Sequence, residues 1–139
     1  MKNVPALPAV LVVDDEVRSQ EALRRTLEED FSVFTASAAD DALAIMEREQ
    51  GASGGKGVQV VLCDQRMPGT SGVAFLTEVR QRWPDVVRIV LSGYTEAGDI
   101  IAGINEAGIY QYLLKPWQPE QLLLTLKSAA NVWRLQQDN

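Results

Sequence analysis

Residues 60–69 read VVLCDQRMPG, and this stretch carries the strongest indication of the fold. Four apolar residues in a row predict a strand that is covered on both faces, and Pro68-Gly69 predicts a sharp turn soon after it. A single acid, Asp64, stands between the run and the turn. A carboxylate that leaves a core costs free energy unless another group shares its charge. The stretch therefore predicts a buried strand that ends on an acid with a charged partner.

Short apolar runs of this kind occur five times along the chain. Those at 9–13, 58–63 and 86–91 are β-branched and nearly continuous, as is typical of strands buried on both faces. The run at 31–36 alternates more with polar residues, which suits an edge strand. The fifth run lies at 109–114.

Amphipathic helical patterns lie between and after these runs. One pattern stops before Pro84, and another ends at Gly108, a residue suited to a helix C-cap. Strands that alternate with helices require right-handed crossovers and a parallel sheet with helices on both faces. The sequence therefore predicts an α/β, doubly wound (βα)5 domain, with helices at 17–30, 38–50, 71–83, 97–108 and 119–139.

Length and composition indicate one globular domain over residues 1–139, with 46% hydrophobic and 23% charged residues. Residues 1–8 are expected to form a tail, because they are too few and too broken by proline for a signal peptide or a membrane span. The formal net charge of −6 argues against contact between this domain and nucleic acid. The single cysteine, Cys63, excludes an intramolecular disulfide and favours a reducing, cytoplasmic location.

The chain contains no histidine. His-based zinc sites and His-dependent catalytic triads are therefore excluded. Any phosphohistidine chemistry would have to come from another protein.

Polar residues follow four of the five predicted strands. The first strand is followed by Asp14 and Asp15, the third ends on Asp64, the fourth on Ser92 and the fifth on Lys115. In doubly wound sheets the ligand site lies beyond the carboxyl ends of the strands. We therefore expect an acidic pair, a lone carboxylate, a hydroxyl and an ammonium to meet at one edge.

This set of groups suits phosphoryl transfer to an aspartate. Carboxylates close to one another repel unless they share a cation or a proton, and oxygen ligands without His or Cys suit Mg²⁺. Lys115 can hold an incoming anion, and Ser92 offers a hydroxyl to a phosphoryl oxygen. A carboxylate nucleophile, Mg²⁺ and a lysine are the required parts.

Four motifs in the expected order resemble the receiver domain of two-component response regulators (CheY-like domains), over nearly the whole chain. They are VVDDE at 12–16, LCDQRMPG at 62–69, LSGYT at 91–95 and YLLKPW at 112–117. The resemblance implies a flavodoxin-like sheet with strand order 2-1-3-4-5. It also implies a signalling domain rather than an enzyme.

The resemblance assigns roles residue by residue. Asp64 corresponds to the phosphoacceptor, while Asp15, Asp14 and the backbone carbonyl of Arg66 complete the Mg²⁺ ligands. Lys115 and Ser92 correspond to the groups that stabilise the phosphoryl group. Ser92 and Tyr112 correspond to the switch pair, and the Lys115-Pro116 peptide bond is expected to be cis.

The mechanism implied by the family begins with a sensor histidine kinase, whose phosphohistidine donates to Asp64. Ser92 then moves toward the phosphoryl group and Tyr112 fills the vacated space. This shifts a pre-existing equilibrium at the face formed by the last two helices and the last strand.

Longer motifs, DQRMPGTSGVAFL, SGYTE and YLLKPW, resemble the receivers of NtrC-type hydrogenase transcriptional regulators, the HupR and HoxA group. That resemblance implies an AAA+ module and a DNA-binding domain after the receiver, with sigma54-type control of hydrogenase genes. Similar motifs occur in the receivers of cyclic-di-GMP phosphodiesterases, and a receiver of that kind remains an alternative. Arg66 and Tyr94 depart from the commoner pattern and are placed to cover the phosphoryl group.

The last helix, 119–139, carries one apolar stripe and has no Gly or Pro stop. We expect this helix to continue as a linker to an output domain. We also expect the chain to form a homodimer through its last helices.

Other interpretations stay open at this level. Asp14 and Asp15 could form a helix N-cap. Ser92 could be an ordinary residue at the end of a strand, and Tyr112 could simply pack in the core. A small Mg²⁺-dependent aspartyl-phosphate phosphatase is the enzyme alternative, although such enzymes space two acids after one strand. A flavodoxin-like cofactor binder would need a phosphate-cradling loop where this chain has Asp-Asp-Glu.

Overall fold

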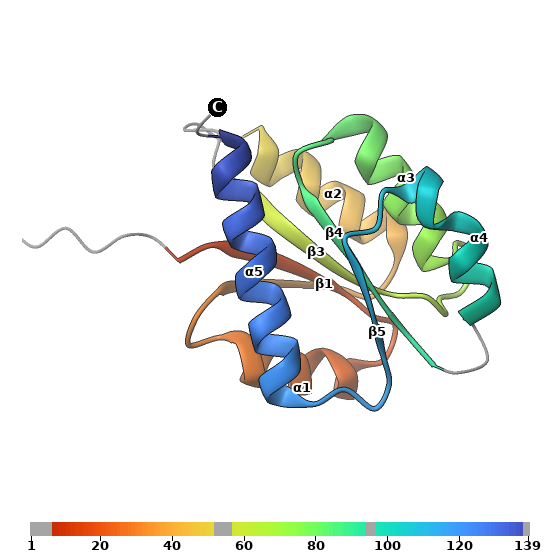
Figure 1. The fold of residues 1–139 in the computed structure, drawn as a ribbon, viewed down its shortest axis with the longest axis horizontal. Coiled ribbons are helices and arrows are strands. Elements are labelled where there is room, and N and C mark those ends of the chain that lie inside the picture. Colours follow the sequence, from red (N-terminus) through yellow and green to blue (C-terminus); the bar gives the residue numbers. More distant parts are fainter. Residues whose placement is uncertain (1–6, 52–56, 94–96, 138–139) are drawn as a thin grey trace, which may run out of the picture.

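The computed structural model describes residues 7–51, 57–93 and 97–137. Five strands and five helices alternate along it (Figure 1). The strands are β1 (Ala9–Val13), β2 (Ser32–Ala36), β3 (Val58–Asp64), β4 (Val87–Ser92) and β5 (Gln111–Leu114). The helices are α1 (Val17–Leu27), α2 (Ala39–Gln50), α3 (Gly72–Arg82), α4 (Ala97–Ala107) and α5 (Pro119–Gln137).

All strand pairs are parallel, and the order in the sheet is β2-β1-β3-β4-β5. The predicted (βα)5 fold and strand order are confirmed, as is the edge position of the second strand. β3 includes Asp64 as its last residue, and Asp64 pairs in register with Leu91 of β4. Ser92 in turn pairs with Leu114 of β5. The register therefore brings the polar ends of the strands to one edge.

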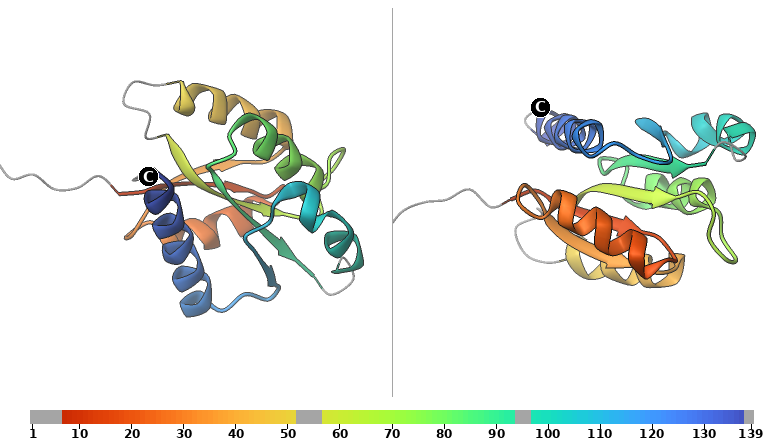
Figure 2. Two further views of the ribbon diagram at one scale, coloured as in Figure 1. Left: turned by 45° about the horizontal axis from the view of Figure 1, so that its top comes forward. Right: turned by 90° about the horizontal axis from the view of Figure 1, so that it is seen from below.

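The continuous apolar runs arise because both faces of the sheet are covered (Figures 1 and 2). Alternate residues of a strand point to opposite faces. In β1, Leu11 and Val13 pack into one cluster with α2, α3 and α4, whereas Val10 and Val12 pack into the other with α1 and α5. α5 buries the expected stripe of Leu122, Leu126 and Ala129, with Ala130 and Trp133 packed beside it.

Several predicted bounds were wrong by a few residues. β5 begins at Gln111 rather than 109, since Ile109 still closes the end of α4 by donating its N–H to Ile104 O at 3.3 Å. Gly108 has a φ of 61°, so the predicted glycine C-cap of α4 is confirmed. None of the described helices is long and apolar enough to cross a bilayer.

Candidate functional site

Asp14 stands directly after β1 and is held on three sides. Its N–H donates to Ala36 O at 3.0 Å, which extends the pairing with β2. Its Oδ1 accepts from the Glu16 N–H at 2.9 Å, and its carbonyl accepts from Gln20 Nε2 at 2.7 Å. The side chain is only 1% exposed, whereas that of the next residue, Asp15, is exposed. The first turn of α1 therefore fixes one buried and one exposed carboxylate side by side.

Asp64 is carried by β3 and is 5% exposed. The loop after it is tied down on both sides, because the Gln65 N–H donates to Leu91 O and the Gly72 N–H donates to Gln65 O, each at 2.9 Å. A Cβ at position 72 would lie 2.5 Å from Asp64 O, so the start of α3 approaches the strand end as closely as only glycine permits. Asp64 is thus held on rigid backbone.

β4 and β5 supply a hydroxyl and an ammonium. Ser92 is fully buried and its Oγ donates to Gly93 O at 2.8 Å. The Lys115 N–H donates to Ser92 O at 2.7 Å, and the Lys115–Pro116 peptide bond is cis. Lys115 Nζ lies 2.8 Å from Asp64 Oδ1. The charged partner that the opening stretch predicted for Asp64 is therefore Lys115.

The three carboxylates lie close together, with one oxygen each of Asp14, Asp15 and Asp64 all within 4.8 Å of one another. The pKa of Asp14 is raised from 3.8 to about 6, chiefly by burial and to a smaller extent by the charges of Asp64 and Asp15. The Glu16 N–H and Lys115 act in the opposite direction. Burial, with help from Asp64 and Asp14, also raises the pKa of Cys63, so its thiol is neutral.

The donor set fits a hard divalent cation. Asp64 Oδ1 is buried and, among the described residues, receives the Lys115 ion pair but no well-aligned hydrogen bond. Three carboxylates against one ammonium leave excess negative charge in a partly buried place, which a cation would relieve. All the available ligands are oxygens, which is the preference of Mg²⁺.

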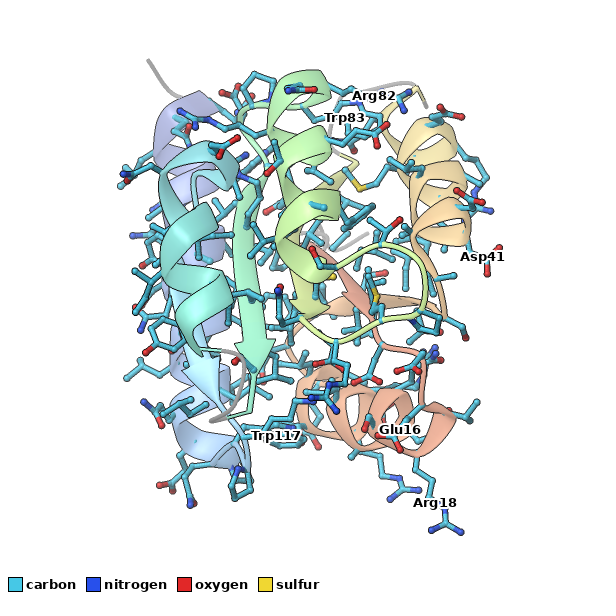
Figure 3. The ribbon with its side chains drawn as sticks, turned by 90° about the vertical axis from the view of Figure 1, so that its right-hand side faces the viewer. Glu16, Arg18, Asp41, Arg82, Trp83 and Trp117 are labelled. Carbon is cyan, nitrogen blue, oxygen red and sulfur yellow. The ribbon has the colours of Figure 1, made fainter. Side chains whose placement is uncertain are left out.

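A hollow of about 370 Å³ opens onto these groups, lined by Asp15, Glu16, Asp64, Arg66, Gly93 and Lys115. Figure 3 shows Glu16, at the start of α1, and Trp117, after β5, on this edge of the molecule, with Arg82 and Trp83 at the opposite edge. The hollow can admit a small anionic group next to Asp64. The arrangement can therefore place a nucleophilic carboxylate, a cation site and an ammonium around one phosphoryl group.

The structure brings the predicted residues Asp14, Asp15, Asp64 and Lys115 together. Arg66 is exposed and lines the hollow. Tyr112 lies beside Val90 in the sheet and packs, half-buried, against the cluster formed with α2, α3 and α4. Tyr94, which was expected to cover the phosphoryl group, lies outside the described residues.

Two buried glutamines next to the site were missed at the level of sequence. Gln65 Oε1 accepts the Val73 N–H at 2.9 Å and joins the loop after Asp64 to α3. Gln20 contacts the Asp14 carbonyl. The available signal was its spacing, since Gln20 stands three residues before Leu23 on the stripe of α1 that is buried. A polar residue in an apolar stripe of a helix is expected to be buried and to form hydrogen bonds there.

Comparison with known families and proteins agrees with this geometry. The family model for the response regulator receiver domain matches residues 10–127. The chain is 60% identical over 129 residues to the hydrogenase transcriptional regulatory protein HoxA of Cupriavidus necator, and 58% identical to HoxA of Bradyrhizobium diazoefficiens. Each alignment covers 93% of this chain but 25% of the relative, so the chain spans about a quarter of their length.

Among solved structures, the chain is similar to a response regulator receiver domain protein from Clostridium thermocellum. The TM-score is 0.84 at 30% identity, with 93% of this chain and 98% of the other chain covered. The similarity thus extends over essentially the whole fold.

Proposed function

The chain belongs to the response regulator receiver domain family, and from this premise we propose that Asp64 accepts a phosphoryl group from the phosphohistidine of a sensor histidine kinase. The observation that carries the proposal is the charge around Asp64. Lys115 Nζ lies 2.8 Å from its Oδ1, and oxygens of Asp14, Asp15 and Asp64 lie within 4.8 Å of one another.

In the transfer, an oxygen of the Asp64 carboxylate attacks the phosphorus atom. A new O–P bond forms as the N–P bond to the donor imidazole breaks, and the bonding pair returns to the imidazole nitrogen. Lys115, which faces the hollow, neutralises charge on the arriving phosphoryl oxygens. The protein contributes mainly position and charge, as is general for phosphoryl transfer.

Mg²⁺ would be held by Asp14, Asp15 and Asp64 together with the backbone carbonyl of Arg66. When bound, it supplies positive charge to the transferring phosphoryl group. Asp14 has to be ionised to take part, and its pKa of about 6 allows that near neutral pH. Arg66 is exposed and lines the hollow, where its side chain would influence access of water to the phosphoryl group.

Ser92 and Tyr112 are proposed as the switch pair. Ser92 Oγ donates to the adjacent Gly93 carbonyl, a neutral acceptor that a charged phosphoryl oxygen, which accepts a stronger hydrogen bond, can replace. Tyr112 packs half-buried against the core cluster that also contains Ile100 of α4. A movement of Ser92 toward the phosphoryl group would let Tyr112 move inward and bias the face formed by α4, β5 and α5.

The output is proposed from the relatives. Sequence identity to two hydrogenase transcriptional regulators supports a receiver that controls an AAA+ module and a DNA-binding domain in a cytoplasmic, sigma54-type regulator of hydrogenase genes. α5 would continue as the linker, and dimers would form through the last helices. A receiver of a cyclic-di-GMP phosphodiesterase is the alternative output, and it would share the same chemistry at Asp64.

Acetyl phosphate with Mg²⁺, followed by intact mass spectrometry, tests the proposal. We expect one phosphoryl group per chain, none in the Asp64→Asn variant and none when EDTA removes Mg²⁺. Asp41→Asn is the matched control, because Asp41 is an exposed acid in the first turn of α2 (Figure 3).

Two outcomes would contradict the proposal: phosphorylation that persists in Asp64→Asn, or steady turnover of a general phosphoester such as p-nitrophenyl phosphate. The second result would indicate the phosphatase alternative.

A further inference from the structure

Gln20 is a buried polar side chain beside the acidic edge. It is 8% exposed and shares the buried stripe of α1 with Leu23 and Leu27. A buried amide costs free energy unless its hydrogen-bonding groups find partners. The contacts of Gln20 therefore indicate what the residue does.

The Gln20 amide nitrogen joins three segments of the chain. Nε2 lies 2.7 Å from Asp14 O, 2.9 Å from Ser37 Oγ and 3.4 Å from Ala36 O. The shortest bond goes to the carbonyl after β1, and the other two go to the end of β2 and the residue after it. One side chain thus ties the acid-bearing loop to the neighbouring strand end.

The Asp14 carbonyl belongs to the peptide group that links Asp14 to Asp15. Fixing this oxygen fixes the plane of that peptide, which includes the Asp15 Cα. The Glu16 N–H, bonded to Asp14 Oδ1, holds the peptide on the other side of Asp15, and the two bonds together restrain the direction of the Asp15 Cα–Cβ bond. The carboxylate of Asp14 has its own restraint, the Glu16 N–H at 2.9 Å. The Asp15 side chain is exposed, so packing does little to restrain it.

We propose that Gln20 is a positioning residue for the cation site, which acts by orienting the Asp14–Asp15 peptide so that Asp15 faces Asp64. The inference rests on the proposed function, since it concerns the affinity of the same acidic edge for Mg²⁺. Groups that orient metal ligands through hydrogen bonds change metal affinity about 10- to 100-fold when they are removed.

A purely structural role is the competing explanation. Under that explanation, loss of Gln20 would destabilise the fold to the same extent as loss of any comparable glutamine. Gln50 is such a residue, since its Nε2 donates to Val58 O at 3.3 Å and its Oε1 accepts the Val58 N–H at 2.7 Å. It bridges the end of α2 to the start of β3, at the opposite end of the sheet.

The test measures Mg²⁺ dissociation constants by calorimetry on the 139-residue chain, for wild type, Gln20→Met and the control Gln50→Met. We expect Gln20→Met to weaken Mg²⁺ binding at least about tenfold and Gln50→Met to stay within about threefold of wild type. The rate of phosphorylation by acetyl phosphate at saturating Mg²⁺ should recover to within about threefold in Gln20→Met, because the ligands themselves remain.

A second readout needs no metal. In metal-free protein, amide hydrogen exchange at the Asp14 and Glu16 N–H groups should accelerate in Gln20→Met and not in Gln50→Met. Gln20→Asn, whose amide is one methylene too short to reach the Asp14 carbonyl, replaces Gln20→Met if the latter does not fold.

Equal Mg²⁺ affinity in the Gln20 variants and in Gln50→Met would overturn the inference. A wild-type chain that binds no Mg²⁺ would instead overturn the proposed function, so the two failures are distinguishable.

Discussion

Buried charge is treated in opposite ways at the two ends of the sheet. At the carboxyl ends of the strands, two buried acids and an exposed one face a single ammonium, and the buried Asp64 Oδ1 has only the Lys115 ion pair among the described residues. At the amino ends, Arg88 of β4 is 9% exposed and donates from Nε to Ala107 O at 2.8 Å and from Nη1 to Val86 O at 2.7 Å.

The surroundings of Arg88 are those of a satisfied charge. It makes further hydrogen bonds to Gly108 O and Pro84 O, each at 3.2 Å, and it lies at the C-terminus of α4, where the helix dipole favours a cation. Burial, and to a lesser degree Arg80, lower the pKa of Arg88, but a guanidinium stays charged in proteins. The amino end uses buried charge for architecture, whereas under the proposed function the carboxyl end keeps charge available for a ligand.

The largest effect is expected from Lys115→Met. This change removes the ammonium next to Asp64 while keeping most of the side-chain length. Phosphorylation by acetyl phosphate should slow about 100- to 1,000-fold, since one donor aimed at developing charge is typically worth that much. Stopped-flow or quenched mass measurements give the rate.

Lys127→Met serves as the control for Lys115→Met, because Lys127 is an exposed α5 residue paired with Asp30 at 3.5 Å. Equal phosphorylation rates in Lys115→Met and Lys127→Met would contradict the view that charge at the carboxyl ends of the strands serves a ligand.

Arg88→Met addresses the other end. Four backbone carbonyls would lose a donor, and we expect the free energy of unfolding to fall by about 2–3 kcal/mol. Mg²⁺ affinity and phosphorylation rate should not change, because the four carbonyls that accept from Arg88 lie at the amino ends of the strands and the hollow lies at their carboxyl ends. Urea denaturation with and without Mg²⁺ measures both.

Arg48→Met is the matched variant for Arg88→Met, since Arg48 is exposed and forms an ion pair with its neighbour Glu49 at 2.9 Å. Its effect on the free energy of unfolding should stay within about 0.5 kcal/mol. A tenfold loss of Mg²⁺ affinity in Arg88→Met would mean that the two ends are coupled.

The acidic edge could be predicted from the sequence because its cause is local. Each acid or base follows an apolar run directly, and parallel strands end at the same edge, so Asp64 and Lys115 needed no long-range information to be placed together. The start of β5 was misjudged because Ile109 is as apolar inside a turn as it would be in a strand.

Arg88 and Gln20 could not be assigned for a different reason. Arg88 interrupts an apolar run, and nothing in its neighbours indicates that carbonyls 19 and 20 residues away will accept its protons. Gln20 likewise finds Ser37 17 residues away. Hydrogen bonds that join separate crossovers become visible only when the fold is known.

The smallest effect is expected from Asp14→Asn in the absence of Mg²⁺, and it is a gain of stability. The pKa of Asp14 is raised from 3.8 to about 6 by folding. The folded state therefore binds more protons than the unfolded state between these values, and the stability of the wild type falls as pH rises through that window. Asparagine is neutral throughout and escapes this loss.

In EDTA at about pH 8, Asp14→Asn should be more stable than wild type by about 1–2 kcal/mol, less than the full linkage value because the site opens to solvent. At about pH 4 the gain should vanish, and saturating Mg²⁺ should reverse the order, since only the wild type keeps all three carboxylates. Urea denaturation at both pH values measures the difference. If Asp14→Asn is less stable than wild type at about pH 8 without Mg²⁺, the prediction is wrong. The charge of Asp14 would then be compensated by contacts within the protein, as that of Arg88 is, and would not require a cation.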